Sequence, residues 1–160
     1  YNAYTSEERT VYYGAVLAER GGELLELLSD LMRPALRDED FEVEKQVILE
    51  EIAMYDDRPS FQVFERGNRH FYAGHPLGQS VLGSVETIRA LKRKQMQAYF
   101  ERRYASDNLL LALAGNYDWE AVLRALEVHS ADWRPAGAGR SYPALKPRSG
   151  LVQECDSSLG

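Results

Sequence analysis

Two glutamates, Glu44 and Glu51, stand seven residues apart in the segment from Asp40 to Pro59, and this spacing could support metal chemistry. Seven residues make about two helical turns, so the two side chains differ by only about 20° in direction. Apolar side chains lie within roughly 60 to 80° of Glu44 on the same helix; they are Phe41, Val47, Ile48, Ile52 and Tyr55. The pattern therefore predicts that both carboxylates point along the apolar face, whereas Glu50 points to solvent.

A carboxylate on an apolar face needs a partner. Moving an ionised carboxylate out of water costs several kcal/mol unless a cation, a metal or several hydrogen-bond donors meet it. One interpretation is a pair of contacts from Arg or Lys, or a position at the edge of the face where the acids reach solvent. The other is a metal or catalytic role, and the helix pattern alone leaves both open.

Other residue types offer little for catalysis. His70 and His75 are five residues apart, which does not place two imidazoles on one helix face. His129 stands near a predicted helix end, and we expect all three histidines to be structural or solvated. The chain has no Gly-x-Ser-x-Gly motif, and Cys155 has no local catalytic signature, so a nucleophilic hydrolase is not indicated.

The composition is that of one globular domain. The 160 residues are 44% hydrophobic and 28% charged, with a formal net charge of −6. This charge argues against nucleic acid or an anionic membrane as partners. No apolar run approaches the roughly 18 residues of a membrane span, and no signal peptide is visible. We expect a soluble protein, with a cytoplasmic location favoured, cut from a longer polypeptide.

The pattern predicts an α+β domain, with a mostly antiparallel sheet and helices packed on one face. Strands are expected at Tyr1–Thr5 and Thr10–Leu17, where Tyr, Thr and Val are frequent, and at the apolar run Leu109–Ala114, which should be buried on both faces. Helical periodicity is found in five further segments; they are 23–33, 61–72, 84–91, 94–104 and 119–129. Residues 135–150 are predicted to form a linker. We expect residues 151–160 to be the start of the next unit, with a strand at 151–155.

Two stretches together resemble the pitrilysin/insulinase family of zinc metallopeptidases, which includes the mitochondrial processing peptidases and their bacterial relatives. Asn2-Ala3-Tyr4-Thr5-Ser6, followed by Thr10-Val11-Tyr12-Tyr13, is similar to the first of these stretches. Residues 44–52, EKQVILEEI, are similar to the second. His75-Pro76-Leu77-Gly78, Gly83 and the segment from Tyr104 to Gly115 follow in the order found in the family, so the resemblance covers almost the whole chain.

The resemblance implies a zinc-dependent metalloendopeptidase. The family's inverted motif H-x-x-E-H supplies two histidine ligands and a glutamate base. By position in the motif, Glu51 is then the third zinc ligand and Glu44 the acid that supports the site from outside the coordination sphere. The resemblance also implies that Asn2, Ala3, Tyr4 and Thr5 form the edge strand on which an extended peptide or unfolded polypeptide pairs.

The 160 residues contain no H-x-x-E-H, which in the family precedes the Asn-Ala-Tyr-Thr strand. We therefore expect residues 1–134 to be the greater part of the peptidase's N-terminal domain, inactive alone, with weak or absent zinc binding. The remaining half of the peptidase, or a partner subunit, would complete the substrate site. The alternative is a family member without catalytic activity that serves as a scaffold or partner subunit.

Overall fold

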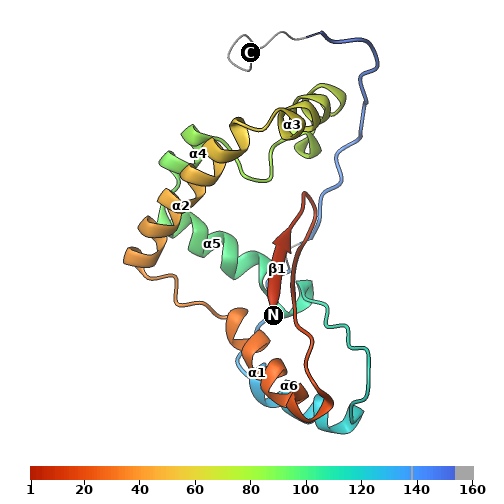
Figure 1. Cartoon of the computed structure of the whole chain (residues 1–160). Helices are drawn as coiled ribbons and strands as arrows, with labels where there is room; N and C mark the ends of the chain where they lie inside the picture. Colours follow the sequence, from red (N-terminus) through yellow and green to blue (C-terminus); the bar gives the residue numbers. More distant parts are fainter. Residues whose placement is uncertain (138, 154–160) are drawn as a thin grey trace. The chain divides into compact units, whose positions relative to one another are not determined.

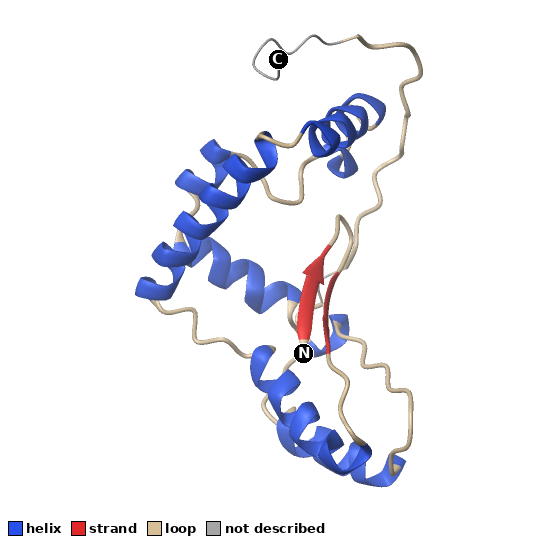
Figure 2. Ribbon diagram, viewed as in Figure 1, coloured by secondary structure: helices blue, strands red, loops and turns tan. Residues whose placement is uncertain are grey.

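The computed structural model describes residues 1–137 and 139–153, which divide into two compact units. The first unit comprises Tyr1–Leu36 and Lys92–Arg140, and the second comprises Arg37–Leu91 with the described residues after position 140. Across these described residues, helices predominate and the two strands form one small antiparallel sheet (Figure 1, Figure 2). The predicted α+β class is confirmed.

The sheet is a β-hairpin in the first unit, formed by β1 (Asn2–Thr5) and β2 (Thr10–Tyr13). Tyr, Thr and Val favour strands because their side chains pack well on a pleated surface. The Ser6 N–H donates to the Arg9 carbonyl at 2.8 Å, which closes a tight turn around the two acidic residues between them. The register pairs Asn2 with Tyr13, Ala3 with Tyr12, Tyr4 with Val11, and Thr5 with Thr10.

Three helices of the first unit are α1 (Gly21–Leu31), α5 (Arg93–Arg103) and α6 (Trp119–His129). Helix α1 packs against α6 and buries Leu25 and Ser29. The buried Ser29 hydroxyl donates to the Leu25 carbonyl at 2.8 Å, so its polar atom is satisfied within the helix. After α1, the Arg33 guanidinium lies 4.5 Å above the Trp133 ring in a cation–π contact.

The second unit is built around α2 (Asp38–Asp56), which contacts both α3 (Pro59–Phe71) and α4 (Val85–Ala90). Pro59 is tolerated in the first turn of α3 because that backbone position needs no hydrogen-bond donor. The ring of Tyr55 on α2 lies 4.5 Å from the ring of Phe61 on α3. Helix α4 starts with a reciprocal capping box between Ser84 and Thr87.

The predicted strand at Leu109–Ala114 is wrong. These residues adopt neither helix nor strand, and Leu110 is 94% exposed. An apolar run predicts burial, but a strand also needs a hydrogen-bonding neighbour, and within the described chain β1 and β2 pair only with each other.

The predicted linker at 135–150 contains no helix or strand in its described part, yet it is anchored at several points. The Arg148 N–H donates to the Phe71 carbonyl at 2.9 Å within the second unit. Residues 151–153 likewise form no helix or strand, and the rest of the expected strand at 151–155, together with Cys155, lies outside the described residues. The domain boundaries at 134 and 150 stay predictions.

In the first unit, Asp107 anchors the start of the predicted linker. Its carboxylate accepts hydrogen bonds from the N–H groups of Ala136, at 3.1 Å, and Gly137, at 2.8 Å. These two bonds stabilise the charged form and lower the pKa of Asp107. The anchor is therefore complete above the ordinary aspartate pKa of about 3.9 and is lost as the pH falls through the lowered value.

We expect Asp107→Asn to increase amide hydrogen exchange at Ala136 and Gly137, because the amide side chain lacks the charge and one acceptor oxygen. The measurement is the protection factor of both amides near neutral pH. Asp132→Asn is the matched control, since Asp132 is an exposed aspartate of the same unit. Equal protection in wild type and Asp107→Asn would mean that other contacts hold this turn.

Candidate functional site

Strand β1 presents one backbone edge that is not paired with β2. Adjacent pairs in an antiparallel ladder alternate between bonded and non-bonded types. Since the Ser6–Arg9 pair is hydrogen bonded, the bonded pairs along the register are Tyr4–Val11 and Asn2–Tyr13. The N–H and C=O groups of Ala3 and Thr5 therefore point to the free edge.

All four residues of β1 are exposed, as an edge strand for peptide pairing requires. The Ala3 N–H donates a hydrogen bond to the Oδ1 of the neighbouring Asn2 at 2.8 Å. The hydroxyls of Thr5 and Thr10 lie 3.2 Å apart across the hairpin, and the Tyr4 ring contacts the Tyr13 ring edge-on. These contacts fix the strand while its backbone edge stays exposed.

The predicted direction of Glu44 is wrong. Glu44 is exposed, and Glu51 is only partly buried. The buried side of α2 carries Phe41 and Ile52, which are 8% and 7% exposed. On a helical wheel this buried side is centred roughly 60 to 80° from Glu44, so the two acids lie at its border rather than on it.

A second apolar strip runs along the other side of the two acids. It consists of Val43, Val47 and Met54, which are 64%, 50% and 44% exposed. The predicted burial of Val47 is therefore also wrong. The wheel places apolar residues on both sides of the acids, and tertiary packing buries only one of the two strips.

No Arg or Lys meets either acid among the described residues, and neither carboxylate makes a hydrogen bond or ion pair there. The interpretation as a salt-bridged pair is thus not supported, whereas the position at the edge of the apolar face is. Glu50 is exposed, as predicted.

Zinc needs about three protein ligands with oxygen, nitrogen or sulfur donors at about 2.0–2.3 Å. In the described part of the chain, no three His, Cys, Asp or Glu side chains gather into such a group. These residues by themselves therefore do not fit a complete zinc site. Glu51 offers one carboxylate, with no described cation competing for it.

Lys45 is a charged residue on the buried side of α2 that the helical pattern did not single out. Its side chain is only 12% exposed, and its ammonium donates to the carbonyls of Arg89 and Leu91, both at 3.2 Å. It thereby satisfies carbonyls at the C-terminus of α4, where a positive charge is favourable. A helical wheel of α2 indicates the buried position of Lys45, because Lys45 falls about 100° from Glu44, next to Ile52.

His75 has a structural role in the described chain. Its Nδ1 accepts the Leu77 N–H at 3.2 Å, so Nε2 carries the proton and donates to the Pro143 carbonyl at 3.2 Å. The imidazole thus connects the loop after α3 to the segment after position 140. This agrees with the expectation that His75 is structural.

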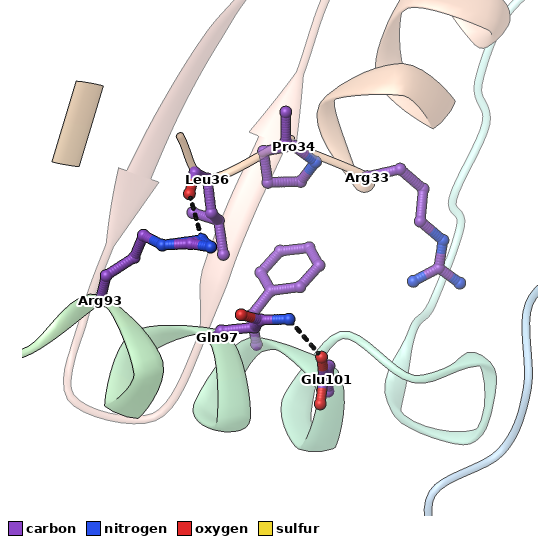
Figure 3. A pocket seen from close by; sticks show the side chains of 8 residues that line it. Arg33, Pro34, Leu36, Arg93, Gln97 and Glu101 are labelled. Atoms are coloured by element: carbon purple, nitrogen blue, oxygen red, sulfur yellow. Dashed lines mark hydrogen bonds between the residues drawn. The ribbon is translucent and has the colours of Figure 1, made fainter. Parts of the chain in front are cut away.

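A pocket of about 260 Å³ opens in the first unit between the segment after α1 and helix α5 (Figure 3). Its lining mixes apolar and charged side chains; they are Arg33, Pro34, Ala35, Leu36, Arg93, Gln97, Phe100 and Glu101. Arg93 donates to the Leu36 carbonyl at 3.2 Å, and Gln97 donates to Glu101 at 2.9 Å. None of the predicted site residues lines this pocket.

No helix in the described chain has both the length and the apolar character needed to cross a bilayer.

Comparison with known proteins gives a match between residues 1–85 and the model of the insulinase family, peptidase family M16. The matched region includes both β1 and α2, and therefore every predicted site residue.

Individual relatives extend this similarity along the chain. An uncharacterized zinc protease of Rickettsia felis is 33% identical over 128 residues, which cover 79% of this chain and 31% of that protein. The probable mitochondrial-processing peptidase subunit beta of Schizosaccharomyces pombe is 32% identical over 151 residues, covering 92% of this chain and 33% of that protein.

The fold is also found in a solved structure. An M16-like peptidase from Alicyclobacillus acidocaldarius matches with a TM-score of 0.71 and 30% identity, over 84% of this chain and 32% of that one. The chain thus spans about a third of the length of the relatives it matches. With more than half of its residues matched by the family model, the chain belongs to the insulinase family of peptidases, family M16.

Proposed function

We propose that this chain is part of the zinc-binding domain of a zinc metalloendopeptidase, in which Glu51 is a zinc ligand. Glu44 supports the metal site from outside the coordination sphere, and Asn2, Ala3, Tyr4 and Thr5 bind an extended peptide. Because the chain spans about a third of its relatives, the activity is proposed for the full-length protein.

The observation that carries this proposal is the position of Glu51. It is partly buried at the border of the packed face of α2, and no described side chain neutralises it. A partly buried carboxylate with no described counter-charge is available to a cation, and zinc is a cation that accepts carboxylate oxygen. The names of the relatives, zinc protease and processing peptidase, support the same choice.

The spacing of the acids supports a division of roles between them. Seven residues correspond to about 10 Å along a helix axis, whereas a zinc–carboxylate bond is about 2.0–2.2 Å. One acid at the metal and the other behind it fits this spacing better than two direct ligands. The exposed strip of Val43, Val47 and Met54 beside the acids supports a further protein element packing there in the full-length protein.

The free edge of β1 supports peptide binding by strand addition. Ala3 and Thr5 direct backbone groups to an extended chain, and the Ala3 N–H would exchange its bond to the Asn2 side chain for one to the peptide. Such pairing recognises the peptide backbone rather than its side chains. Zinc, when bound by the complete ligand set, would lower the pKa of a bound water and make it nucleophilic at neutral pH. The contribution of β1 is to hold the peptide backbone in an extended conformation.

The experiment is a zinc and activity assay on the purified full-length protein. We expect one zinc per chain and cleavage of extended fluorogenic peptides, with activity lost on chelation and restored by added zinc. A protein that carries zinc but cleaves no peptide, alone or with a partner subunit, would contradict the peptidase assignment.

A non-catalytic subunit is the second candidate, because one relative is named as a subunit of a processing peptidase, and a peptidase built of several subunits can contain members that do not themselves cleave. Such a protein would bind no zinc and would raise peptide cleavage only when added to a catalytic partner. The same assay, with zinc content measured first, separates the two functions.

A further inference from the structure

We propose that Tyr104 is a positioning residue for the peptide-binding edge, acting through Tyr12 on β2. This inference rests on the proposed function of β1, and it assigns a role to a side chain outside the strand and outside the metal site. The Tyr104 hydroxyl lies 3.1 Å from the Tyr12 hydroxyl, at hydrogen-bond distance, within the first unit.

The hairpin is largely exposed in the described part of the chain. All four residues of β1 are exposed, and on β2 only Val11 and Tyr12 are partly buried. An isolated two-stranded hairpin is marginally stable in water, so its geometry depends on what it packs against. The rings of Tyr12 and Tyr104 also meet edge-to-face at 6.4 Å, which adds an apolar contact to the hydrogen bond.

Tyr104 is itself fixed on a rigid element. It follows the last residue of α5, and its ring stacks on Phe100 at 4.3 Å with an angle of 19° between the rings. Its carbonyl accepts a hydrogen bond from the Arg33 guanidinium at 3.4 Å, and Arg33 in turn stacks on Trp133. The hydroxyl is thus presented from a side chain held on both its ring and its backbone.

The register connects this anchor to the free edge. Tyr12 is directly opposite Ala3, the residue at the middle of the unpaired edge of β1. Holding Tyr12 therefore holds the position of Ala3 across the ladder, and a peptide that pairs with the Ala3 backbone depends on that position. Residues far from a reacting bond affect catalysis in this way when they set substrate geometry.

The Tyr104 hydroxyl stays protonated, as a lasting hydrogen bond to Tyr12 requires. Burial raises the pKa of Tyr104 to about 12, and the hydrogen bond with Tyr12 acts in the same direction. Tyr104 therefore keeps its proton throughout the physiological range.

The test is a double-mutant cycle in the full-length protein with Tyr104→Phe, Tyr12→Phe and the double variant. We expect each single change to raise KM for an extended peptide by about threefold to tenfold, the range of one hydrogen bond. Zinc content and kcat should stay within about twofold. The double variant should be no worse than either single variant, because both remove the same bond.

Tyr99→Phe is the matched control, since it removes a hydroxyl from α5, the helix just before Tyr104, at a side chain that is 53% exposed. It should leave KM unchanged. An additive double variant, or a lower melting temperature with unchanged KM in Tyr104→Phe, would overturn the proposal, because the pair would then serve stability alone.

Hydrogen exchange separates this proposal from the proposed function. Tyr104→Phe should lower the protection of the ladder amides of Tyr4 and Val11 severalfold, whether or not the protein cleaves peptides. Faster exchange in a protein without peptidase activity would support the anchor and refute the peptidase. Unchanged exchange at both amides would overturn the anchor, even in an active peptidase.

Discussion

Replacing Glu51 by glutamine in the full-length protein is expected to abolish tight zinc binding and, with it, peptide cleavage. Loss of a group that supports a zinc ligand from outside the coordination sphere costs about 10–100-fold in metal affinity or activity. Loss of a ligand should cost more than about 100-fold. Zinc per chain, measured by atomic absorption after gel filtration, should fall from one to a small fraction.

The neighbouring glutamates provide graded controls. Glu44→Gln should weaken zinc binding by about 10–100-fold, as expected for a supporting acid. Glu50→Gln should change neither zinc content nor activity, because Glu50 is exposed on the same helix and points away from both acids.

A folding defect is excluded by comparing the metal-free proteins. Glutamine has nearly the shape of glutamate, and Glu51 makes no described contact that glutamine would break. The free energies of unfolding of the metal-free wild type and the metal-free Glu51→Gln variant should therefore agree within about 0.5 kcal/mol. Retention of one zinc per active chain in Glu51→Gln would mean that Glu51 is not a ligand.

The second large effect is expected from Ala3→Pro, which should raise KM for extended peptides by about tenfold or more. Proline has no N–H, and its ring occupies the space from which a peptide carbonyl would approach. Because the Ala3 N–H points to the free edge, the ladder with β2 loses no hydrogen bond, and proline is tolerated at such edge positions. The one bond lost within the chain is the local bond from the Ala3 N–H to the Asn2 Oδ1. A tenfold change corresponds to about 1.4 kcal/mol.

Ala3→Val is the matched control for Ala3→Pro. It adds a branched side chain that strands accept well and keeps the N–H, so KM should change little. Zinc content should be unaffected in both variants, since β1 supplies no metal ligand. Unchanged KM in Ala3→Pro, with the hairpin intact by hydrogen exchange at Tyr4 and Val11, would contradict peptide pairing on this edge.

Local patterns predicted the elements that depend on local chemistry. The hairpin of β1 and β2 follows from strand-forming residues around a polar turn, and helix α6 follows from helical periodicity. Helix α6 has its predicted bounds, whereas β2 ends at Tyr13 and not at the predicted Leu17. Leu109–Ala114 failed because the strand prediction needed a neighbour that a local pattern does not specify.

The direction of the acids on α2 was only partly predictable. Apolar residues flank them on both sides, so periodicity alone does not choose which strip is buried. Packing against α3 and α4 buries the strip with Phe41 and Ile52 and leaves Val47 exposed. Lys45 was missed because a lysine is assumed to face water unless its acceptors, here two backbone carbonyls far along the chain, are known.

The free edge of β1 also bears on how copies of this protein behave at high concentration. An unpaired strand edge is a template for another copy of the same strand, which leads to aggregation. Glu7 and Glu8 at the hairpin turn and the net charge of −6 make two copies repel each other. Salt screens this repulsion over a Debye length of about 8 Å at physiological ionic strength, so colloidal stability should decrease as salt is added.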